Sequence, residues 1–265
     1  MSKIRLITWN INSVRARLDI VDRLLAEYKP DILCLQETKV QNQMFPADVF
    51  NKHGLIHHAL AGQKSYHGVA TLSRLPIASI NIIDWCGKGD ARHVETALDN
   101  GIKLHNFYVP AGGDEPDIAL NEKFAHKLDF LAEMTDWSHT LPQNDHHILV
   151  GDLNIAPLES DVWSHKQLIN VVSHTPAECE ALSAVQEAHN WFDVMRHFVP
   201  DPERLYSWWS YRARDWRTSD KGRRLDHIWC SPPLKEKMKS MKVLEDARGW
   251  EKPSDHAPVM VDIEL

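Results

Sequence analysis

The sequence has few cysteines and no long apolar run, and these absences exclude several classes of protein. It contains four cysteines, none of them paired as C-x-x-C, and Cys34 lies inside an apolar run. We therefore expect buried thiols in a reducing compartment rather than a disulfide scaffold. No stretch approaches the roughly 18 uncharged apolar residues of a membrane span, and residues 1–4 carry no apolar signal region. We accordingly expect a cytoplasmic protein with no membrane partner.

The chain also lacks internal repeats, low-complexity tracts and linkers. Its 265 residues, 43% hydrophobic and 25% charged, are typical of a compact globular domain. A chain of this size buries roughly 70–75% of its unfolded surface, so no disulfide is needed to stabilise it. We expect a single catalytic domain over 1–265 and a monomer. The sequence does not identify protein partners.

Positive charge is scarce overall but concentrated in one segment. The formal net charge of -7 argues against coating nucleic acid by bulk attraction, because the average field repels phosphate. Segment 204–224 is the exception, with seven basic residues, two acids and five aromatic rings: Arg204, Arg212, Arg214, Arg217, Lys221, Arg223, Arg224, Asp215, Asp220, Tyr206, Trp208, Trp209, Tyr211 and Trp216. Arginines neutralise phosphates and flat rings stack on bases or sugars, so this mixture is typical of a nucleic-acid surface. A solvated loop with its tryptophans in the core has the same composition.

The spacing of apolar residues predicts an architecture that mixes helices and strands. Helical periodicity predicts helices over 14–28 and 120–137, and from the capping sequence Thr175-Pro176-Ala177-Glu178 toward residue 190. Shorter apolar runs predict strands at 4–10 and 31–37 and near 66–73, 77–83, 94–98, 102–109, 148–153, 225–230 and 258–263. These strands are too many and too unevenly interleaved with helices for a simple parallel α/β repeat. A mixed or antiparallel sheet core is favoured.

Five apolar runs stop abruptly on an acid, an amide or a histidine, within segments 4–10, 31–37, 147–154, 224–229 and 254–258. A polar group at a strand end is held by rigid backbone yet points out of the core, where a catalytic group must lie. Each stop also has an ordinary explanation: a solvated Glu37, a chance Gly-Asp-x-Asn, a capping Asp255, or strand-ending amides at Asn10 and Asn12. Together they predict one phosphate-cleaving site whose oxygen donors suit magnesium or manganese better than zinc.

These motifs, in this order, resemble the exonuclease III family of AP endonucleases and 3′–5′ exodeoxyribonucleases, and its bacterial branch in particular. The similar segments span essentially the whole chain: Trp9-Asn10-Ile11-Asn12 with Val14-Arg15-Ala16-Arg17, Leu35-Gln36-Glu37-Thr38-Lys39, Tyr108-Val109-Pro110, Gly151-Asp152-Leu153-Asn154, Tyr206-Ser207-Trp208-Trp209 with Tyr211-Arg212, Arg224-Leu225-Asp226, and Glu251-Lys252-Pro253-Ser254-Asp255-His256-Ala257-Pro258. The resemblance implies the DNase I-like fold, which is an α+β, four-layer sandwich: two packed mixed β-sheets flanked by helices.

The resemblance also implies a metal site. Glu37 would be the principal ligand of Mg²⁺, for which Mn²⁺ substitutes, and Asn10 would bridge to metal-bound water or to the phosphate. Magnesium keeps several waters, so one firm carboxylate is an adequate anchor. Asp255 would serve an additional metal site or a water near the leaving group. The full set of candidate metal-binding residues is Asn10, Glu37, Asp152, Asn154, Asp255 and His256.

For catalysis, the resemblance implies a water-activating acid and several phosphate-binding groups. Asp152 would orient and deprotonate the attacking water, while the amide of Asn154 positions it and donates to a phosphate oxygen. His256 would hydrogen-bond the scissile phosphate, kept positively charged by Asp226. Tyr108 would offer its phenol to the phosphate or to the leaving oxygen.

The implied substrate is duplex DNA carrying abasic sites or recessed and blocked 3′ ends. Members of the family incise the backbone 5′ to an abasic site, and many also remove nucleotides or blocking groups from 3′ ends. Trp208, Trp209 and Leu225 lie where relatives build an apolar pocket for the flipped baseless sugar, and Arg212 would enter a groove as a wedge. The other substrate-binding candidates are Asn12, Arg15 and Arg17. Ala111 and Arg223 depart from the residues of several relatives, so the balance between endonuclease and exonuclease activity stays open.

Two other classes of function remain as alternatives. One is a same-fold phosphatase acting on lipid or small phosphoesters, against which the aromatic and arginine-rich segment 204–224 counts. The other is a DNA-binding or scaffold protein whose catalytic residues are vestigial, against which the complete set of polar stops counts. The histidine pairs at 57–58 and 146–147 lack the spaced partners of a zinc site, and Trp137, Trp163, Trp191 and Trp250 are expected in the core or at interfaces.

Overall fold

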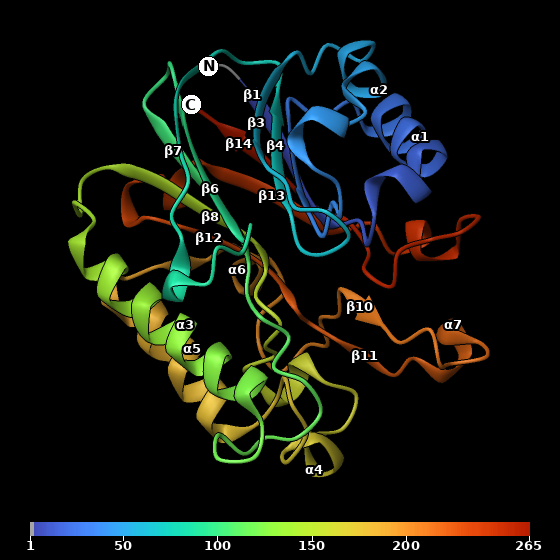
Figure 1. Cartoon of the computed structure of the whole chain (residues 1–265), viewed down its shortest axis with the longest axis vertical. Helices are drawn as coiled ribbons and strands as arrows, with labels where there is room; N and C mark the ends of the chain where they lie inside the picture. The colour runs from blue at the N-terminus through green and yellow to red at the C-terminus, as the bar shows by residue number, and fades with distance from the viewer. Residues whose placement is uncertain (1–2) are drawn as a thin grey trace.

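The computed structural model describes residues 3–265, in which two six-stranded sheets pack face to face (Figure 1). The first sheet contains, in spatial order, β13 (Met238–Val243), β14 (Val259–Glu264), β1 (Lys3–Asn10), β2 (Ile32–Gln36), β4 (Val69–Ser73) and β3 (His57–Ala61). The second contains β5 (Ile77–Asn81), β6 (His93–Leu98), β7 (Ile102–Tyr108), β8 (His146–Asp152), β12 (Asp226–Cys230) and β9 (Phe192–Asp193). Met1 and Ser2, which belong to the segment expected to lack a signal region, lie outside the described residues.

Each sheet is mixed, with one parallel pair among antiparallel neighbours. The parallel pairs are β1 with β2 and β7 with β8. A separate two-stranded ribbon, β10 (Trp208–Trp209) with β11 (Gly222–Arg223), projects from the sandwich at the lower right of Figure 1. The expected α+β fold of two packed mixed sheets flanked by helices is confirmed.

The helices cover the two outer faces, which gives four layers (Figure 1). The α-helices are α1 (Leu18–Tyr28), α2 (Ala47–Asn51), α3 (Glu122–Thr140), α4 (His165–Leu168), α5 (Pro176–Ala188), α6 (Val194–Phe198) and α7 (Trp216–Ser219). Short 3₁₀ turns are η1 (Val14–Ala16), η2 (Asn42–Met44), η3 (Trp85–Gly87), η4 (Glu159–Asp161), η5 (Pro232–Lys237) and η6 (Glu245–Gly249). The helices α1 and α2 lie on the first sheet, whereas α3 and α5 lie on the second. None of the helices in the described part of the chain is long and apolar enough to span a bilayer.

Three hydrophobic layers explain why the central strands have continuous apolar runs. Ile4 and Leu6 of β1 face the other sheet, where they join Ile148 and Val150 of β8 in one cluster. Ile7 of β1 points the opposite way and packs beneath α1. A third cluster fills the space between the second sheet and the helices α3 and α5. Because side chains alternate along a strand and both faces are covered, nearly every position must be apolar.

The structure corrects several predicted boundaries. The helix expected from residue 14 begins as a 3₁₀ turn, and α1 starts only at Leu18, because Ser13 has φ 85° and Arg17 is also non-helical. The second helix starts after Leu120, which is 78% exposed, because the Asn121 side chain caps the backbone N–H of Lys123. The capping box at 175–178 is confirmed by α5.

The sequence reasoning also missed two full strands at the outer edges of the first sheet. β13 has the sequence MKSMKV, in which lysines interrupt the apolar alternation. An edge strand tolerates such charges because one of its sides faces solvent. β3 at the opposite edge begins with the histidine pair His57-His58, which hid its strand character.

Candidate active site

The polar stops meet at one end of the sandwich, and three of them, Asn10, Asp152 and Asp226, share the parity of inward-facing strand positions. Asn10 continues the series Ile4 and Leu6 along β1, and Asp152 continues Ile148 and Val150 along β8. Tyr108 of β7 lies beside Asp152 in the parallel pairing, and Asp226 at the start of β12 pairs with Asp152 in the antiparallel one. The strand ends therefore place these side chains together in the gap between the two sheets.

A layer of buried amides and a hydroxyl forms the floor of this gap. Gln36 of β2 donates from Nε2 to Thr8 Oγ1 at 2.9 Å and to Asn106 Oδ1 at 2.7 Å, which links the two sheets. Asn106 of β7 donates in turn to the carbonyl oxygens of Leu35 and Ala70. This network lies directly beneath the polar stops, and because its members are fully buried, it fixes the spacing of the two sheets there.

Glu37 leaves the end of β2 in the left-handed region, with φ 51°, and its carboxylate accepts three side-chain hydrogen bonds. Asn10 Nδ2 and Tyr108 Oη each lie 2.9 Å from Glu37 Oε1. Lys39 Nζ lies 2.7 Å from Glu37 Oε2. Burial raises the pKa of Glu37, but the bonds from Asn10 and Lys39 outweigh it, and the pKa lies below its ordinary value.

Asp152 occupies the centre of the site and is 1% exposed. Asn10 Nδ2 donates to Asp152 Oδ2 at 2.8 Å, and the backbone N–H of Asn154 donates to Oδ1 at 2.9 Å. The preceding Gly151 has φ 139°, and a Cβ there would lie 1.9 Å from the carbonyl oxygen of Phe107. Only glycine lets β8 approach β7 so closely, which gives the Gly-Asp-x-Asn motif a steric reason.

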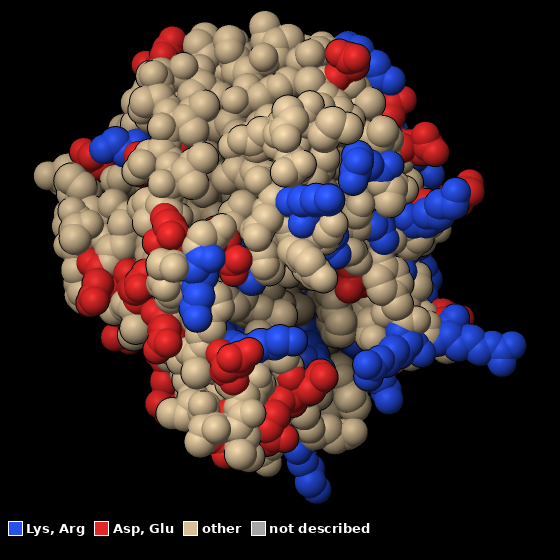
Figure 2. Space-filling view, in the orientation of Figure 1, with Lys and Arg blue, Asp and Glu red and all other residues tan. Residues whose placement is uncertain are grey.

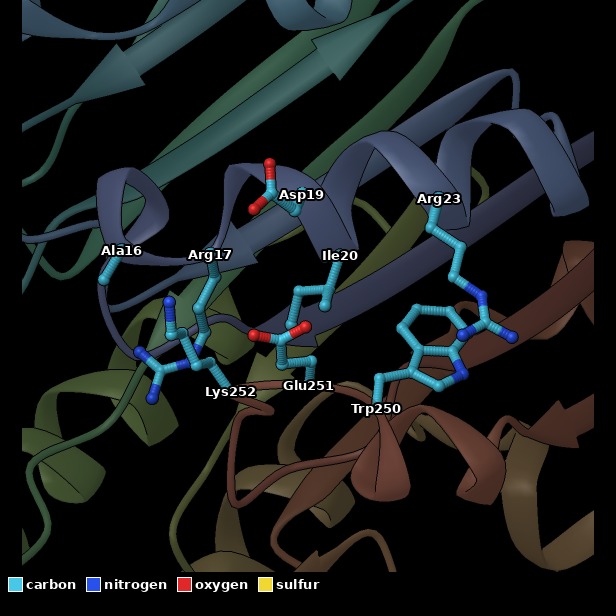
Figure 3. A pocket seen from close by; sticks show the side chains of 8 residues that line it. All are labelled: Ala16, Arg17, Asp19, Ile20, Arg23, Trp250, Glu251 and Lys252. Carbon is cyan, nitrogen blue, oxygen red and sulfur yellow. The ribbon is translucent and has the colours of Figure 1, made fainter.

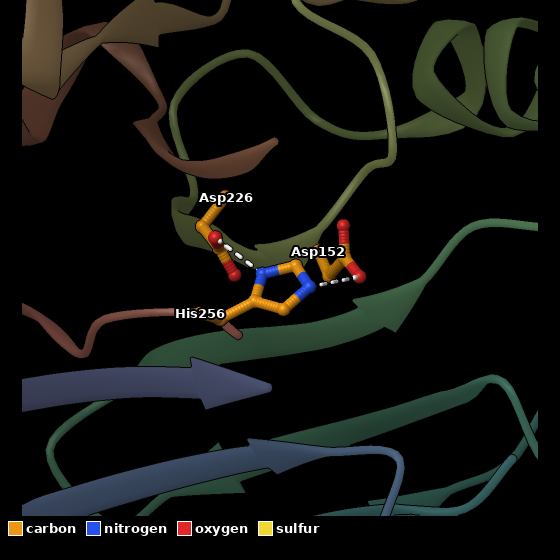
Figure 4. A group of neighbouring side chains, drawn as sticks. All are labelled: Asp152, Asp226 and His256. Carbon is orange, nitrogen blue, oxygen red and sulfur yellow. Dashed lines mark hydrogen bonds and ion pairs between the residues drawn. The ribbon is translucent and has the colours of Figure 1, made fainter. Parts of the chain in front are cut away.

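Asp226 and His256 form a buried acid–imidazole pair next to Asp152 (Figure 4). His256 Nδ1 lies 2.8 Å from Asp226 Oδ2, and Nε2 lies 3.6 Å from Asp152 Oδ2. Burial lowers the pKa of His256, but the carboxylates of Asp226 and Asp152 outweigh it and raise the pKa to about 10. Burial, together with the carboxylate of Asp226, raises the pKa of Asp152 to about 7 against the opposing charge of His256.

Asp255 is held slightly apart from this centre. Its Oδ2 accepts from Trp208 Nε1 at 2.9 Å, and its Oδ1 accepts from Asn12 Nδ2 at 3.2 Å. Asn12 Oδ1 in turn accepts from Lys39 Nζ at 2.7 Å. Asp255 is thereby linked to the Glu37 side of the site through Asn12 and Lys39, and the group of Asp152, Asp226 and His256 with metal-ligand spacing does not include it.

A pocket of about 490 Å³ opens beside the centre, and its lining combines indole rings with positive charge. Asn154 is one of its lining residues, and so are Trp208 and Leu225, which were expected to build such a pocket. The other lining residues are Ala111, Gly113, Asp114, Trp163, Val171, Val172, Ser173, Ser210, Arg212, Lys221 and Arg223. The guanidinium of Arg223 lies over the Trp208 ring and donates to the Val172 carbonyl and to Ser173 Oγ.

Two expectations about aromatic and basic residues are corrected, those for Trp209 and Arg224. Trp209 is 2% exposed and packs against Tyr206, Trp216 and Ala257, so it belongs to the core and not to the pocket lining. Neighbouring residues on β10 face opposite ways, which separates it from Trp208. Trp163, expected in the core or at an interface, packs against the clusters that contain Leu225 and Trp209 and also lines the pocket. Arg224 is buried in ion pairs with Asp161 and Asp193 and adds nothing to the basic surface.

The remaining basic candidates lie on the rim. Arg15 is exposed and lines a shallow hollow with Lys39 and Lys64. Arg17 donates from Nη2 to Tyr211 Oη at 2.9 Å and, with Lys252, lines a cleft of about 180 Å³ beneath the start of α1 (Figure 3). Figure 2 shows Lys and Arg gathered around the hollow next to β10, β11 and α7, and many of the Asp and Glu side chains on the opposite side. The overall negative chain therefore carries a local basic face.

The donor set fits a hard divalent cation. The carboxylates of Glu37, Asp152, Asp226 and Asp255 are linked to one another through a few hydrogen bonds. Among the described residues, Lys39 and His256 are the positive groups in direct contact with these carboxylates. A divalent cation would balance the excess of negative charge, and oxygen ligands favour magnesium-like ions. His256 fits the ligand role less well than a donor role, because an imidazolium has no free lone pair.

Comparisons with known proteins give a consistent result. The sequence pattern of the endonuclease/exonuclease/phosphatase family matches residues 7–256. An exodeoxyribonuclease from Bacillus subtilis is 31% identical over 264 residues, covering 98% of this chain and all of the relative. An AP endonuclease structure from Archaeoglobus fulgidus superposes with a TM-score of 0.92 at 33% identity, over 99% of this chain and all of that one. A 3′ phosphatase from Neisseria bound to a product DNA hairpin gives 0.91 at 29% identity, with 99% and 100% covered.

Proposed function

This chain belongs to the endonuclease/exonuclease/phosphatase family, in its exonuclease III branch, and from that premise we propose that it is a DNA-repair nuclease that hydrolyses phosphodiesters with the help of Mg²⁺. Its substrates are duplex DNA with abasic sites, cut on the 5′ side, and recessed or blocked 3′ ends. We also propose one catalytic domain over 1–265, acting as a monomer in the cytoplasm. The observation that carries the proposal is the bonded constellation of Asn10, Glu37, Asp152, Asp226 and His256 between the sheets.

Glu37 and Asn10 are the residues that would hold the cation, with Asp152 and Asn154 lining the same space. When bound, a divalent cation supplies charge neutralisation at the phosphate oxygens. The positive φ values of Glu37 and Asn154, 51° and 54°, support this assignment, because strained backbone of this kind concentrates at functional sites. Tyr108 keeps its proton, since burial and the neighbouring Glu37 raise its pKa well above the ordinary value. Its hydroxyl is therefore a hydrogen-bond donor.

Asp152 is the general base in this proposal. A pKa of about 7 lets its carboxylate accept a proton from the attacking water near neutral pH. Asn154 holds this carboxylate through its backbone N–H and its side-chain amide, so the base has a fixed orientation. His256, protonated because Asp226 pairs with it, donates from Nε2 to a phosphate oxygen on the same side.

The pocket beside Asn154 receives the part of the substrate beyond the scissile phosphate. Trp208 and Trp163 offer flat surfaces for a sugar, while Arg212, Lys221 and Arg223 make the lining cationic. Such a pocket accepts a baseless sugar or a small anionic 3′ blocking group. Selection by the shape and charge of the damaged nucleotide requires no contact to base edges, which suits repair independent of sequence.

A gel assay with end-labelled duplexes tests the proposal. One duplex carries a single abasic analogue and others carry a recessed 3′ end or a 3′ phosphate, each incubated with the protein and magnesium or with EDTA. We expect magnesium-dependent cleavage of all three. Cleavage of small or lipid phosphoesters without any cleavage of DNA would instead favour the phosphatase alternative, and DNA binding without turnover on any substrate would favour a vestigial site.

A further inference from the structure

A buried ion pair lies behind the proposed site, between the two helices that cover the second sheet. Lys127 of α3 and Glu178 at the start of α5 are both 0% exposed, and Lys127 Nζ donates to Glu178 Oε1. Ion pairs of this kind seldom stabilise a fold more than well-packed apolar residues of similar size. Stability alone is therefore a weak reason for placing charge here.

The three protons of the Lys127 ammonium are directed at three acceptors, two of which belong to the site. Nζ lies 2.8 Å from the carbonyl oxygen of Asn154 and 3.3 Å from that of Ala111. Asn154 has φ 54°, and the bond to its carbonyl oxygen helps to hold this left-handed turn in place. Lys127 thus holds, from beneath, the turn that orients Asp152.

The same lysine supports the loop at the rim of the pocket. Gly112 has φ 87°, and a Cβ built there would lie 2.9 Å from Lys127 Cδ. The backbone of the loop therefore rests directly on the aliphatic stem of Lys127. Ala111 and Gly113, on either side, line the pocket. The position of this rim depends on where the lysine lies.

Glu178 connects the pair to the opposite wall of the pocket. Its carboxylate accepts the backbone N–H of Ser173 at 2.9 Å and 3.0 Å, and the N–H and hydroxyl of Thr175 at 3.2 Å and 2.6 Å. Ser173 Oγ then accepts from Arg223 Nη1 at 2.6 Å. A continuous chain of hydrogen bonds runs from the Asn154 turn, through Lys127 and Glu178, to the arginine of the pocket.

We propose that the Lys127–Glu178 pair is a positioning device that fixes the Asn154 turn relative to the pocket wall formed by Ser173 and Arg223. It sets the distance between the group that orients the catalytic base and the group that contacts the substrate beyond the scissile phosphate. This inference rests on the proposed nuclease function. Neither residue touches the substrate, so both act through Asn154 and Ser173.

The test compares Lys127→Met with a variant of the same helix that only weakens packing. Met134→Ala removes a fully buried apolar side chain of α3 about two turns beyond Lys127, and takes away no polar contact of the site. Both proteins are assayed on the abasic duplex well below their measured Tm. We expect Lys127→Met to lower kcat by about 100-fold with a smaller change in KM, because misplaced catalytic groups cost about that much. Met134→Ala should keep a near-normal kcat despite its lower Tm.

A double variant separates charge burial from positioning. In Lys127→Met/Glu178→Gln no unpaired charge remains, so the Tm should recover relative to Lys127→Met while kcat stays low. The milder Glu178→Asp keeps the ion pair but draws it away from Asn154. It should lower kcat about 10-fold with little change in Tm. This variant decides the test if the two methionine variants fail to fold.

Two results would overturn the inference while leaving the nuclease function standing. One is a kcat that falls in step with Tm for all variants, Met134→Ala included. The other is normal turnover by the double variant or by Glu178→Asp. An inactive wild-type protein would instead contradict the proposed function itself.

Discussion

Buried histidines lie against the second sheet in two places, at its strand ends and on its outer face, and they differ in their partners; His256 comes from the loop before β14. At the strand ends, His256 lies between the carboxylates of Asp226 and Asp152, and its pKa is raised to about 10. On the outer face of the same sheet, beneath α3, His93, His105 and His147 stack in a row among aromatic rings. Burial lowers the pKa of His93 to about 3, and the pKa of His147 to about 4 with help from Lys103.

The comparison teaches that burial alone does not decide whether a histidine is charged. All of these rings are removed from water, but the carboxylates of Asp226 and Asp152 outweigh the effect of burial at His256. At His147 the single carboxylate of Asp145, 3.8 Å from Nε2, does not. In the outer row, His105 Nε2 and His147 Nδ1 lie 3.0 Å apart, so the two rings share a hydrogen bond and both stay neutral. The surroundings of His256 therefore stabilise the charged imidazolium, whereas those of the outer row favour neutral rings.

The largest effect should come from removing the charges that the inner cluster assembles. Asp152→Asn and Glu37→Ala should each lower abasic-site incision by about 10³- to 10⁴-fold, since general-base and metal-anchoring roles are lost. The gel assay measures the rate, and circular dichroism checks that the fold is intact. Asp99→Asn, in an exposed turn of the same sheet, serves as the matched control and should cut at the wild-type rate. Full activity in either site variant would refute the assignment.

A smaller effect is expected when only the partner of His256 is neutralised. Asp226→Asn keeps the shape but removes the largest of the influences that raise the pKa of His256, so the ring should lose its proton at a lower pH. We expect incision to fall by about 100-fold at neutral pH. NMR titration of the His256 ring reports the pKa directly. If the pKa remained as high as in the wild-type protein, the contrast between the two histidine groups would have another cause.

The outer row predicts how stability depends on pH. Because the folded pKa values of His93 and His147 lie below the unfolded value of about 6.5, the unfolded chain binds protons first as pH falls. Each such histidine should lower the free energy of unfolding by about 1.4 kcal/mol per pH unit between about 6.5 and its folded pKa. Above pH 6.5 this contribution is fully present. Urea unfolding from pH 7 to 4 measures the slope.

One substitution tests whether the row is responsible. His93→Phe replaces a ring that stacks on Phe107 with an apolar ring of similar shape, and it should flatten the loss of stability at acidic pH. The exposed His146→Gln should leave the slope unchanged. An unaltered slope in His93→Phe would mean that other groups dominate acid unfolding.

The smallest effects should arise in the cationic pocket, where charge is partly exposed to solvent. Arg223→Gln should raise KM for abasic or 3′-phosphate duplexes several-fold and reduce the salt dependence of DNA binding by about one unit of slope. Binding measured at several salt concentrations provides this slope. Lys239→Gln, on the far edge strand β13, is the control and should change neither quantity. An unchanged slope for Arg223→Gln would argue against contact with a phosphate.

Much of the fold was predictable because buried faces of strands and helices require apolar residues at a regular spacing in the sequence. The runs that became β1, β2, β7 and β8 read as strands since both of their faces are covered, and the amphipathic pattern of α1 read as a helix. The strands β3 and β13 were missed for the converse reason. At the edge of a sheet, histidine and lysine are tolerated, and the periodic signal is lost.

Most residues of the candidate site could be predicted from the sequence, but the contacts that hold them in place could not. The order of motifs identified Asn10, Glu37, Asp152 and His256, and the structure brings them within hydrogen-bonding or ion-pair distance of one another. Lys127 gave no such signal, because a lysine in an amphipathic helix normally points to solvent. Trp209 was assigned to the pocket although it lies in the core, since composition does not reveal which side of a ribbon faces a cavity.

The sequence by itself determined which residue types stand at the ends of the inner strands, and hence the kind of chemistry available. Only the tertiary structure decided the protonation of these residues and the contacts that hold them. These are the charge on His256, the raised pKa of Asp152 and the buried lysine under Asn154. The physical reason is that local pattern fixes which face a side chain takes. Electrostatic energies instead depend on distances between segments remote in the chain, and packing of the two sheets sets those distances.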